Sequence, residues 1–255
     1  MTVRYHELIS VVIPAYNAEK TLAKAVESVF AQTYQNFELI IINDCSLDNT
    51  LALAGQYAQQ DIRVRVFENA QNSGVSITRR KGVDAANGEW IAFLDSDDAW
   101  VSNKLEKQLE LQRRSGAKLI FTGSAFMDTE GNLLDWTLHV PPQIKYRKLL
   151  KQNLISNSSV LILKECYQKH SMTDNGMHED FTCWLNLLKT GETAYGIDEP
   201  LLIYRLSKTS KSGNKLRAAK MNWNTYRAIG LNVFMSTYYQ FHYIIHGLFK
   251  YWNLS

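Results

Sequence analysis

The 255-residue sequence has few cysteines and no long apolar run. Its three cysteines, Cys45, Cys166 and Cys183, are widely spaced and odd in number, which fits neither a disulfide framework nor a CxxC metal site. No stretch of 18 uninterrupted apolar residues occurs, so a membrane-spanning helix is not expected. Glu7 stands where a signal peptide would need an apolar run, so secretion is not expected either. These absences predict a cytoplasmic protein in a reducing compartment.

Acidic residues are absent from residues 200–255, which carry eight of the 28 Lys and Arg residues. Ten of the 29 aromatic residues lie in residues 221–255. A basic, aromatic segment is typical of an amphipathic helix at an anionic membrane surface. The alternative is a helix whose aromatic residues pack on the rest of the protein, and both can hold on opposite faces. Nucleic acid is not expected as a partner, because no nucleic-acid-binding motif accompanies the charge.

Apolar strands alternate with helical patterns in the first 125 residues. Residues 8–13 and 37–42 are nearly continuous apolar runs, as in strands buried on both faces, and an apolar helical stripe begins at Leu22 between them. This alternation predicts an α/β fold with a doubly wound, mostly parallel sheet. Further strands are predicted at 63–68, 90–94, 160–163 and 201–204, and further helices around 50–60, 76–86, 104–114 and 179–189.

Polar residues follow three of these strands. The segments are Pro14-Ala15-Tyr16-Asn17, Asn43-Asp44 and Asp95-Ser96-Asp97-Asp98. In an open parallel sheet, ligands bind at the carboxyl ends of the strands, so these segments are expected at one rim.

The Asp95–Asp98 segment places three carboxylates within four residues, where they repel one another unless a cation neutralises them. Such oxygen ligands favour Mg²⁺ or Mn²⁺, which bind one or two protein carboxylates together with phosphate oxygens. The alternative is that Asp97 or Asp98 caps the next helix or solvates a turn. Asp44, at a neighbouring strand end, favours the metal and diphosphate site. No glycine-rich P-loop or dinucleotide motif offers another phosphate site.

Four segments, in their order and spacing, resemble the inverting GT-A glycosyltransferases of family 2: residues 10–17, 43–50, 72–74 and 88–98. The resemblance is dense over residues 8–125 and sparse to about residue 205. It implies a GT-A catalytic domain over residues 1–205, with a nucleotide-sugar-binding half (1–125) and an acceptor-binding half (126–205). A helical, basic and amphipathic tail would follow at residues 206–255.

The resemblance also implies a role for each strand-end residue. Pro14, Ala15 and Tyr16 would border the nucleotide base, and Asp44 would accept a hydrogen bond from its N3–H, which favours uracil. Arg79 would face the base or the phosphates. Asp95 would lie toward the ribose, Asp97 on Mn²⁺ or Mg²⁺ with Asp95 as a second metal ligand, and Ser96 beside the nucleotide sugar.

The catalytic base implied by the resemblance is Asp180, in the acidic pair that opens the helix at 179–189. The alternative is that Glu179 and Asp180 complement the dipole of that helix. Glu179, Trp184 and Trp100 are candidate acceptor contacts, although aromatic residues at such positions are as often in a core.

The function implied is inverting transfer of a hexose, glucose or galactose, from UDP to a lipid-linked saccharide in O-antigen, capsule or exopolysaccharide synthesis. The protein would then be peripheral on the cytoplasmic face of the inner membrane. A processive synthase is not expected, because the QxxRW motif is absent. A catalytically silent nucleotide-sugar-binding scaffold at the membrane is the alternative, because Asn43 and Cys45 depart from the acid and glycine usual in the family.

Overall fold

The computed structural model describes residues 7–173, 176–206 and 215–252. The strands are β1 (Ile9–Ala15), β2 (Phe37–Asn43), β3 (Val64–Glu68), β4 (Trp90–Phe93), β5 (Ala99–Trp100), β6 (Leu119–Met127), β7 (Leu133–Leu138), β8 (Gln143–Ile144), β9 (Leu161–Leu163) and β10 (Ala194–Arg205). The helices are α1 (Leu22–Phe30), α2 (Thr50–Gln60), α3 (Val75–Ala85), α4 (Lys104–Ser115), α5 (Tyr146–Lys151), the 3₁₀ turn η1 (Asn157–Ser159), α6 (Lys164–His170), α7 (Glu179–Lys189), α8 (Lys215–Ala228) and α9 (Val233–Trp252).

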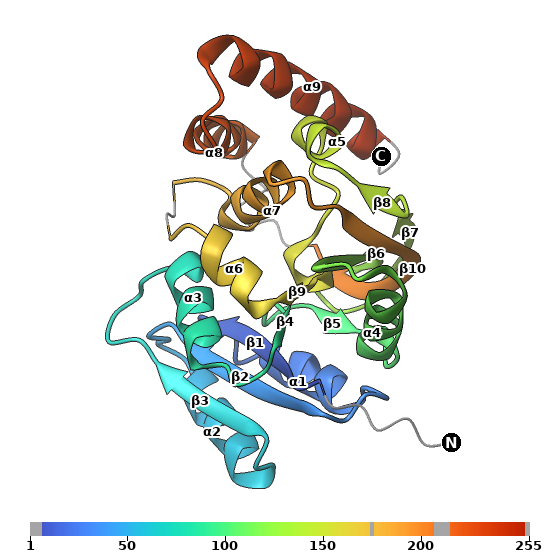
Figure 1. Ribbon diagram of the computed structural model, residues 1–255. Coiled ribbons are helices and arrows are strands. Elements are labelled where there is room, and N and C mark those ends of the chain that lie inside the picture. The colour runs from blue at the N-terminus through green and yellow to red at the C-terminus, as the bar shows by residue number, and fades with distance from the viewer. Residues whose placement is uncertain (1–6, 174–175, 207–214, 253–255) are drawn as a thin grey trace.

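One sheet runs through the molecule in the order β3-β2-β1-β4-β9-β6-β10-β5 (Figure 1). Its longer ladders are parallel: β1 with β2 and β4, β2 with β3, and β6 with β10. The short strand β9 lies antiparallel between β4 and β6, and β5, β7 and β8 add short antiparallel pairs. The predicted α/β fold with a mostly parallel sheet is confirmed.

The two faces of the sheet bury alternate side chains of the same strands. Ile9, Val11 and Ile13 of β1 belong to one buried cluster with residues of α1, α2 and α4, whereas Val12 belongs to a second cluster with residues of α3 and α7. All residues of β1 and β2 are buried, which explains why both read as continuous apolar runs. Helix α3 lies close to β1 because Gly82 has no side chain: a Cβ there would meet Val12 Cγ1 at 2.4 Å.

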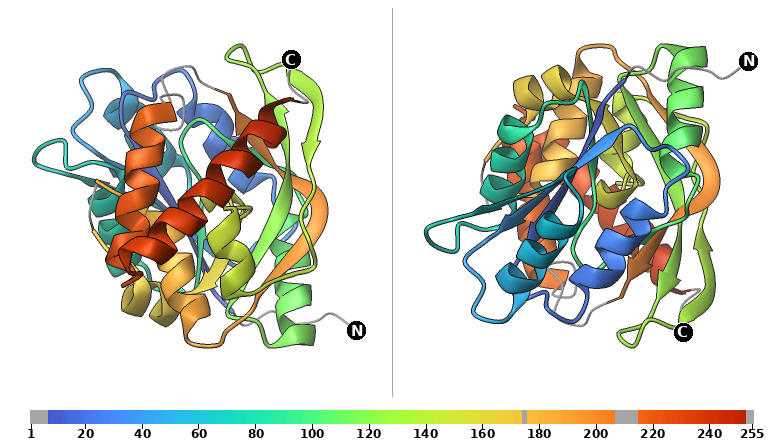
Figure 2. Two further views of the ribbon diagram at one scale, coloured as in Figure 1. Left: turned by 90° about the horizontal axis from the view of Figure 1, so that it is seen from above. Right: turned by 90° about the horizontal axis from the view of Figure 1, so that it is seen from below.

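Helices α8 and α9 form an outer layer over α5 and α7 (Figures 1 and 2). Tyr226, Ile229 and Tyr239 belong to the same hydrophobic core as Trp184 and Phe181 of α7. The Tyr226 hydroxyl donates to the Leu150 carbonyl at 2.7 Å, which fixes α8 to α5. One face of the C-terminal segment therefore packs on the domain. Within the described ranges, no helix is both long and apolar enough to cross a bilayer.

Candidate active site

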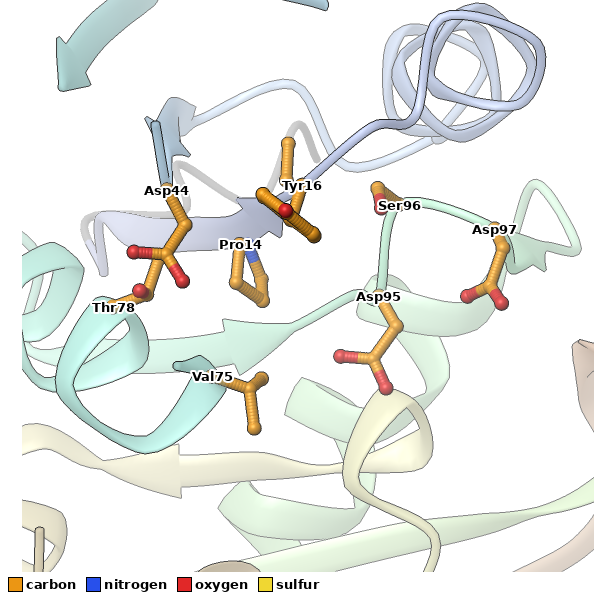
Figure 3. Close-up of a pocket in the computed structure, with 9 residues that line it drawn as sticks. Pro14, Tyr16, Asp44, Val75, Thr78, Asp95, Ser96 and Asp97 are labelled. Carbon is orange, nitrogen blue, oxygen red and sulfur yellow. The ribbon is translucent and has the colours of Figure 1, made fainter. Parts of the chain in front are cut away.

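A cavity of about 200 Å³ opens where β1, β2 and β4 end. It is lined by Pro14, Ala15, Tyr16, Asp44, Val75, Thr78, Asp95, Ser96 and Asp97. Seven of these nine residues are among those predicted to bind the nucleotide sugar. Figure 3 shows that Tyr16 and Pro14, the Asp44 carboxylate and the Asp95–Asp97 segment come from separate strand ends to one cavity. The parallel sheet thus brings the predicted residues together, as its topology requires.

The loops after β1 and β2 hold each other at the rim. The Asn17 amide donates to Ser46 Oγ at 3.0 Å, and the Leu47 amide donates to Asn17 Oδ1 at 2.9 Å. Asn17 and Cys45 adopt positive φ angles of 49° and 58°. Left-handed backbone disfavours a residue with a Cβ, which is why a glycine suits the Cys45 position. Tyr16 remains 46% exposed beside the cavity, where its ring can stack on a base.

Asp44 is buried and fixed by three hydrogen bonds. Its Oδ1 accepts from Asn69 Nδ2 and the Ser73 amide, and its Oδ2 accepts from the Gly74 amide, each at 2.8 Å. Gly74 has φ of +82°, a conformation that L side chains rarely adopt, and it precedes the first turn of α3. A carboxylate has about four acceptor positions, so Oδ2 keeps capacity for one donor from a ligand.

Asp95 and Asp97 present oxygens to the cavity from the loop after β4. Burial and the nearby charge of Asp95 raise the pKa of Asp97 to about 6, although Arg205 and Arg79 oppose the rise. A cation beside the pair would relieve this repulsion. Within residues 7–173, 176–206 and 215–252, no group of three or more His, Cys, Asp or Glu forms a metal site. Two carboxylates, completed by phosphate oxygens, nevertheless match the oxygen ligands of Mg²⁺ and Mn²⁺.

Asp98, the third acid of the segment, is buried away from the cavity. Its Oδ1 accepts the Arg205 amide at 2.9 Å, and Arg205 Nε donates back to the Asp97 carbonyl at 2.9 Å. Burial and the charges of Asp95 and Asp97 raise the pKa of Asp98 well above its usual range. Asp98 therefore joins the end of β10 to the loop that carries Asp95 and Asp97.

Replacing Asp98 by Ala is expected to lower the free energy of unfolding by about 1–3 kcal/mol, because the buried Arg205 amide loses its acceptor. Asp98→Asn keeps that acceptor without the charge and is expected to cost much less. Urea unfolding of the two variants measures the difference. An equal loss in both would contradict the role of Asp98 as the acceptor for the Arg205 amide.

Arg79 joins the Asp95 loop to α7. Its Nη2 donates to Asp95 Oδ1 and its Nη1 to Glu179 Oε1. The Asn157 oxygen, with the amide oriented by its partners, accepts from Nε at 3.1 Å and Nη2 at 3.3 Å. Burial alone would lower the pKa of Arg79, but the charges of Asp95, Glu179 and Asp180 outweigh it and raise that pKa. Arg79 is not among the residues that line the cavity, but it contacts Asp95, which does; that Arg79 faces the base or the phosphates stays a prediction.

Glu179 and Asp180 stand in the first turn of α7. Glu179 is buried against Arg79, whereas Asp180 is half-buried and its Oδ1 accepts its neighbour's amide, that of Phe181, at 2.7 Å. Burial and the charge of Glu179 raise the pKa of Asp180, and Arg79 opposes this. A carboxylate with a raised pKa is suited to accept a proton near neutral pH. Glu179, the residue before Asp180, lies on the other side of Arg79 from Asp95.

Comparison with known proteins agrees with this geometry. The family model "Glycosyl transferase family 2" matches residues 10–175. The chain belongs to glycosyltransferase family 2. TuaG of Bacillus subtilis (strain 168), whose name places it in teichuronic acid biosynthesis, is 40% identical to this family 2 chain over 222 residues, covering 87% of this chain and 88% of TuaG. UDP-Glc:alpha-D-GlcNAc-diphosphoundecaprenol beta-1,3-glucosyltransferase WfgD of Escherichia coli is 32% identical over 245 residues, covering 95% of this chain and 94% of WfgD.

Solved structures share the fold at low identity. S. aureus TarS 1-349 in complex with UDP-GlcNAc superposes with a TM-score of 0.71 at 15% identity, over 91% of this chain and 70% of that chain. Mannosyltransferase PcManGT from Pyrobaculum calidifontis, in complex with GDP-Man and Mn²⁺, superposes with a TM-score of 0.70 at 14% identity, over 90% and 66%. The predicted GT-A fold of this family 2 chain is confirmed.

The two tryptophans predicted to contact the acceptor lie in the core of this family 2 chain. Trp184 is fully buried among the residues of α7 and α8. Trp100 is buried too, donates from Nε1 to the Ser158 carbonyl at 2.7 Å, and packs its ring on the Lys104 ammonium. The prediction that they line an acceptor site is therefore wrong. Glu179 is also buried, which makes it a partner of Arg79 rather than an exposed acceptor contact.

Several residues that shape the site were not predicted from the sequence. Asn69 joins Asp44 to Thr78, because its Nδ2 donates to Asp44 Oδ1 at 2.8 Å and to Thr78 Oγ1 at 3.0 Å. Asn157 and Ser158 come from η1, where Ser158 Oγ accepts the Asp95 amide at 3.0 Å. Asn157 and Ser158 lie about 60 residues after Asp95 in an unpatterned region, so only folding reveals their role.

Proposed function

We propose that this family 2 chain transfers a hexose, glucose or galactose, from UDP to a lipid-linked saccharide acceptor, with inversion at the anomeric carbon. The observation that carries the proposal is one cavity that joins Tyr16 and Asp44 to the Asp95–Asp97 pair, which Arg79 links to Glu179, the residue before Asp180. It offers a base-binding end, a diphosphate end and a proton acceptor. A scaffold that only binds nucleotide sugars would need no such acceptor.

Uracil recognition rests on Asp44. Asp44 lines the cavity, and its Oδ2 accepts one hydrogen bond, which leaves acceptor capacity. The N3–H of uracil is a donor, whereas N3 of cytosine is not. Pro14 and Tyr16 border the same end, so a uracil ring stacked beside Tyr16 would present its N3–H to Asp44. TarS was solved with UDP-GlcNAc, which supports a UDP-sugar donor.

Transfer would proceed by a single displacement. The acceptor oxygen attacks the anomeric carbon, Asp180 takes the hydroxyl proton, and the bond to the diphosphate oxygen breaks with its electron pair leaving on UDP. Attack from the face opposite the leaving group inverts the configuration. The charge of Arg79 opposes the rise in the pKa of Asp180 that burial and Glu179 cause, which favours the ionised form of the Asp180 carboxylate. No covalent intermediate is needed, which agrees with the burial of Cys166 and Cys183.

The acceptor class is proposed from the relatives. WfgD and WfaP of Escherichia coli are both named for glucosyl transfer to a GlcNAc-diphosphoundecaprenol, and this chain covers 94% and 95% of them. TuaG is named for teichuronic acid biosynthesis. A lipid-linked acceptor in surface polysaccharide synthesis would require this chain to work at the cytoplasmic face of a membrane.

The proposal also divides the chain into a donor-binding half and an acceptor-binding half. Every residue that lines the donor cavity lies in residues 1–125, and Asp180 lies in residues 126–205. This supports a nucleotide-sugar-binding half and an acceptor-binding half within a catalytic domain at 1–205. The tail proposed at 206–255 contains α8 and α9, while its residues 207–214 lie outside the described residues.

Chelation of divalent metal by EDTA is expected to lower turnover by about 10–100-fold, with recovery on adding Mn²⁺ or Mg²⁺. Asp97, with Asp95 as second ligand, would hold the ion, which supplies Lewis-acid stabilisation of the departing diphosphate. Steady-state kinetics before and after chelation measures the change. Undiminished turnover in metal-free protein would contradict the assignment of Asp97 as a metal ligand.

The decisive test is a donor screen. UDP-glucose, UDP-galactose and their N-acetyl forms are offered with a lipid-diphosphate GlcNAc or GalNAc acceptor, and NMR reads the product's anomeric configuration. Transfer of glucose or galactose with inversion is expected. Retention of configuration would overturn the single-displacement mechanism, and nucleotide-sugar binding without transfer or hydrolysis would favour the scaffold.

A further inference from the structure

Helix α9 has one face that is fixed to the protein and one that is not. Ser236 and Tyr239 are buried, and Gln240 is held by α8 through Asn222 Nδ2 at 2.9 Å and the Ala219 carbonyl at 3.1 Å. These inward residues recur at positions 236, 239 and 240, a helical period. The orientation of α9 on α8 is therefore set by packing and hydrogen bonds.

The opposite face of α9 exposes large apolar side chains. Phe234 is 86% exposed and Phe241 64%, with Tyr238 and Ile244 about half exposed between and beyond them. These four residues follow one another at three- and four-residue spacing, so they form one stripe, here called the α9 face. Contiguous exposed apolar surface of this kind marks an interaction site, because scattered single residues would not share one helical face.

The surroundings of the α9 face are basic. Residues 200–255 contain no Asp or Glu, and the same is true of residues 136–164, which include α5. Helix α5 contacts α9 and exposes Arg147, Lys148 and Lys151. Helix α8, which also contacts α9, exposes Lys220 and Arg227. Figure 2 (left) shows α5, α8 and α9 together at one end of the molecule.

The basic residues of α5 lie beside the α9 face only because of the tertiary structure. It precedes α9 by about 80 residues, yet the tertiary structure adds its cations to those of the C-terminal segment. Apolar side chains bordered by cations, with no acid on the three helices, match an interface between anionic headgroups and acyl chains.

We propose that the α9 face, bordered by the basic residues of α5 and α8, docks on an anionic lipid bilayer. This rests on the proposed function in one respect, since a lipid-linked acceptor would lie at such a surface. A second copy of this chain fits less well. A twofold dimer through this face would bring the same basic surface of both copies together.

Docking through this face would place the catalytic helix next to the bilayer. Helix α8 packs on α7, and its Asn224 Nδ2 donates to the Gly176 carbonyl at 2.8 Å. The His178 amide, two residues before Asp180, donates to Thr225 Oγ1 of α8 at 3.2 Å. The far end of α7 is joined as well, because Lys189 Nζ donates to the Ile229 carbonyl at 2.7 Å. Helix α8, which packs between α9 and α7, and the residue after it are therefore hydrogen-bonded to both ends of the helix that carries Asp180.

Vesicle sedimentation of the full chain tests the proposal. Wild-type protein is expected to bind vesicles of 70% phosphatidylcholine and 30% phosphatidylglycerol, and the Phe234→Ser/Phe241→Ser variant to bind at least about tenfold more weakly, because two exposed aromatic side chains no longer insert. The matched control, Ile62→Ser/Leu133→Ser, removes two apolar side chains of similar exposure elsewhere and is expected to bind like wild type.

The charge component is tested separately. Arg147→Gln/Lys148→Gln/Lys151→Gln is expected to weaken binding to the anionic vesicles by about tenfold or more per two charges removed, since each cation near such a surface contributes about 1 kcal/mol. The control Lys107→Gln/Arg114→Gln, on the remote helix α4, is expected to bind like wild type. Raising the salt concentration is expected to weaken wild-type binding.

Three results would overturn the proposal. They are no binding of wild type, equal binding of wild type and the Phe234/Phe241 variant, and a wild-type dimer in light scattering that this variant abolishes. If that variant fails to fold by circular dichroism, Phe234→Ser alone and the salt dependence of wild type decide. Transfer to a soluble, short-chain acceptor is expected to be unchanged in the Phe234/Phe241 variant, so docking and the proposed function can fail independently.

Discussion

Replacing Asp180 by Asn is expected to lower kcat by about 10³-fold while leaving the affinity for the UDP-sugar within about twofold. Asparagine has the shape of the carboxylate but cannot take the acceptor's proton. Asp180 does not line the donor cavity, so nucleotide binding has no direct contact to lose. Turnover is measured by product formation, and donor affinity by calorimetry.

The matched control for this variant is Asp84→Asn, which neutralises an exposed carboxylate on α3. It is expected to retain wild-type turnover. Full activity of the Asp180 variant would remove Asp180 as the base. A loss of donor binding equal to the loss of turnover would assign Asp180 to the donor instead.

Replacing Arg79 by Met is expected to lower the free energy of unfolding by about 3 kcal/mol, because its buried carboxylate partners lose their counter-charge. The value lies at the low end of the range for broken buried pairs, since the Asp95 side chain keeps 31% exposure. Turnover is expected to fall as well, because Arg79 positions both Asp95 and Glu179. Urea unfolding and steady-state kinetics measure the two effects.

The pH dependence of the Arg79 variant has a defined sign. Arg79 lowers the pKa of Asp180, so its removal raises that pKa further. A base must be deprotonated to act, and the acid limb of the kcat profile should therefore move to higher pH. A folded-state pKa above the unfolded value means that the folded protein binds more protons. The variant's stability deficit should thus grow as the pH rises through that pKa and shrink in acid.

Two variants separate charge from geometry at this position. Arg80→Met removes the neighbouring arginine, whose ion pair with Asp84 is exposed, and is expected to cost less than about 0.5 kcal/mol. Arg79→Lys keeps the charge but cannot span Asp95, Glu179 and Asn157, so it should restore part of the pH profile and little of the stability. A stability loss in Arg80→Met equal to that in Arg79→Met would contradict the bridging role.

The sequence predicted the elements whose apolar period is strong. The helix expected at 50–60 is α2, and the helix expected at 179–189 is α7. Strands β6 and β7 and the short helices α5 and α6 were not predicted. The apolar sequence pattern of β6 is interrupted by Thr122, Gly123 and Ser124, and α5 has only six residues. Neither element therefore shows an apolar period long enough to recognise.

The donor side of the site was predictable for a physical reason. Its residues follow directly after strands of a parallel sheet, and such strand ends meet at one rim whatever the loops do. The acceptor side was not predictable in this way. Trp100 and Trp184 stand near polar motifs in the sequence, but their apolar rings are more stable in the core than at an open site.

The sequence by itself determined the main strands and helices as far as α4, the family, and most of the residues that line the cavity, because these depend on local patterns and on a topology that few alternatives satisfy. Only the tertiary structure decided what Arg79 does, since its partner Glu179 lies 100 residues away. It also decided that Asp98 is a buried anchor and that the cations of α5 join the α9 face. The burial of a side chain, and its interactions with charges far away in the sequence, depend on which surfaces pack together in the fold. No local sequence pattern specifies that packing.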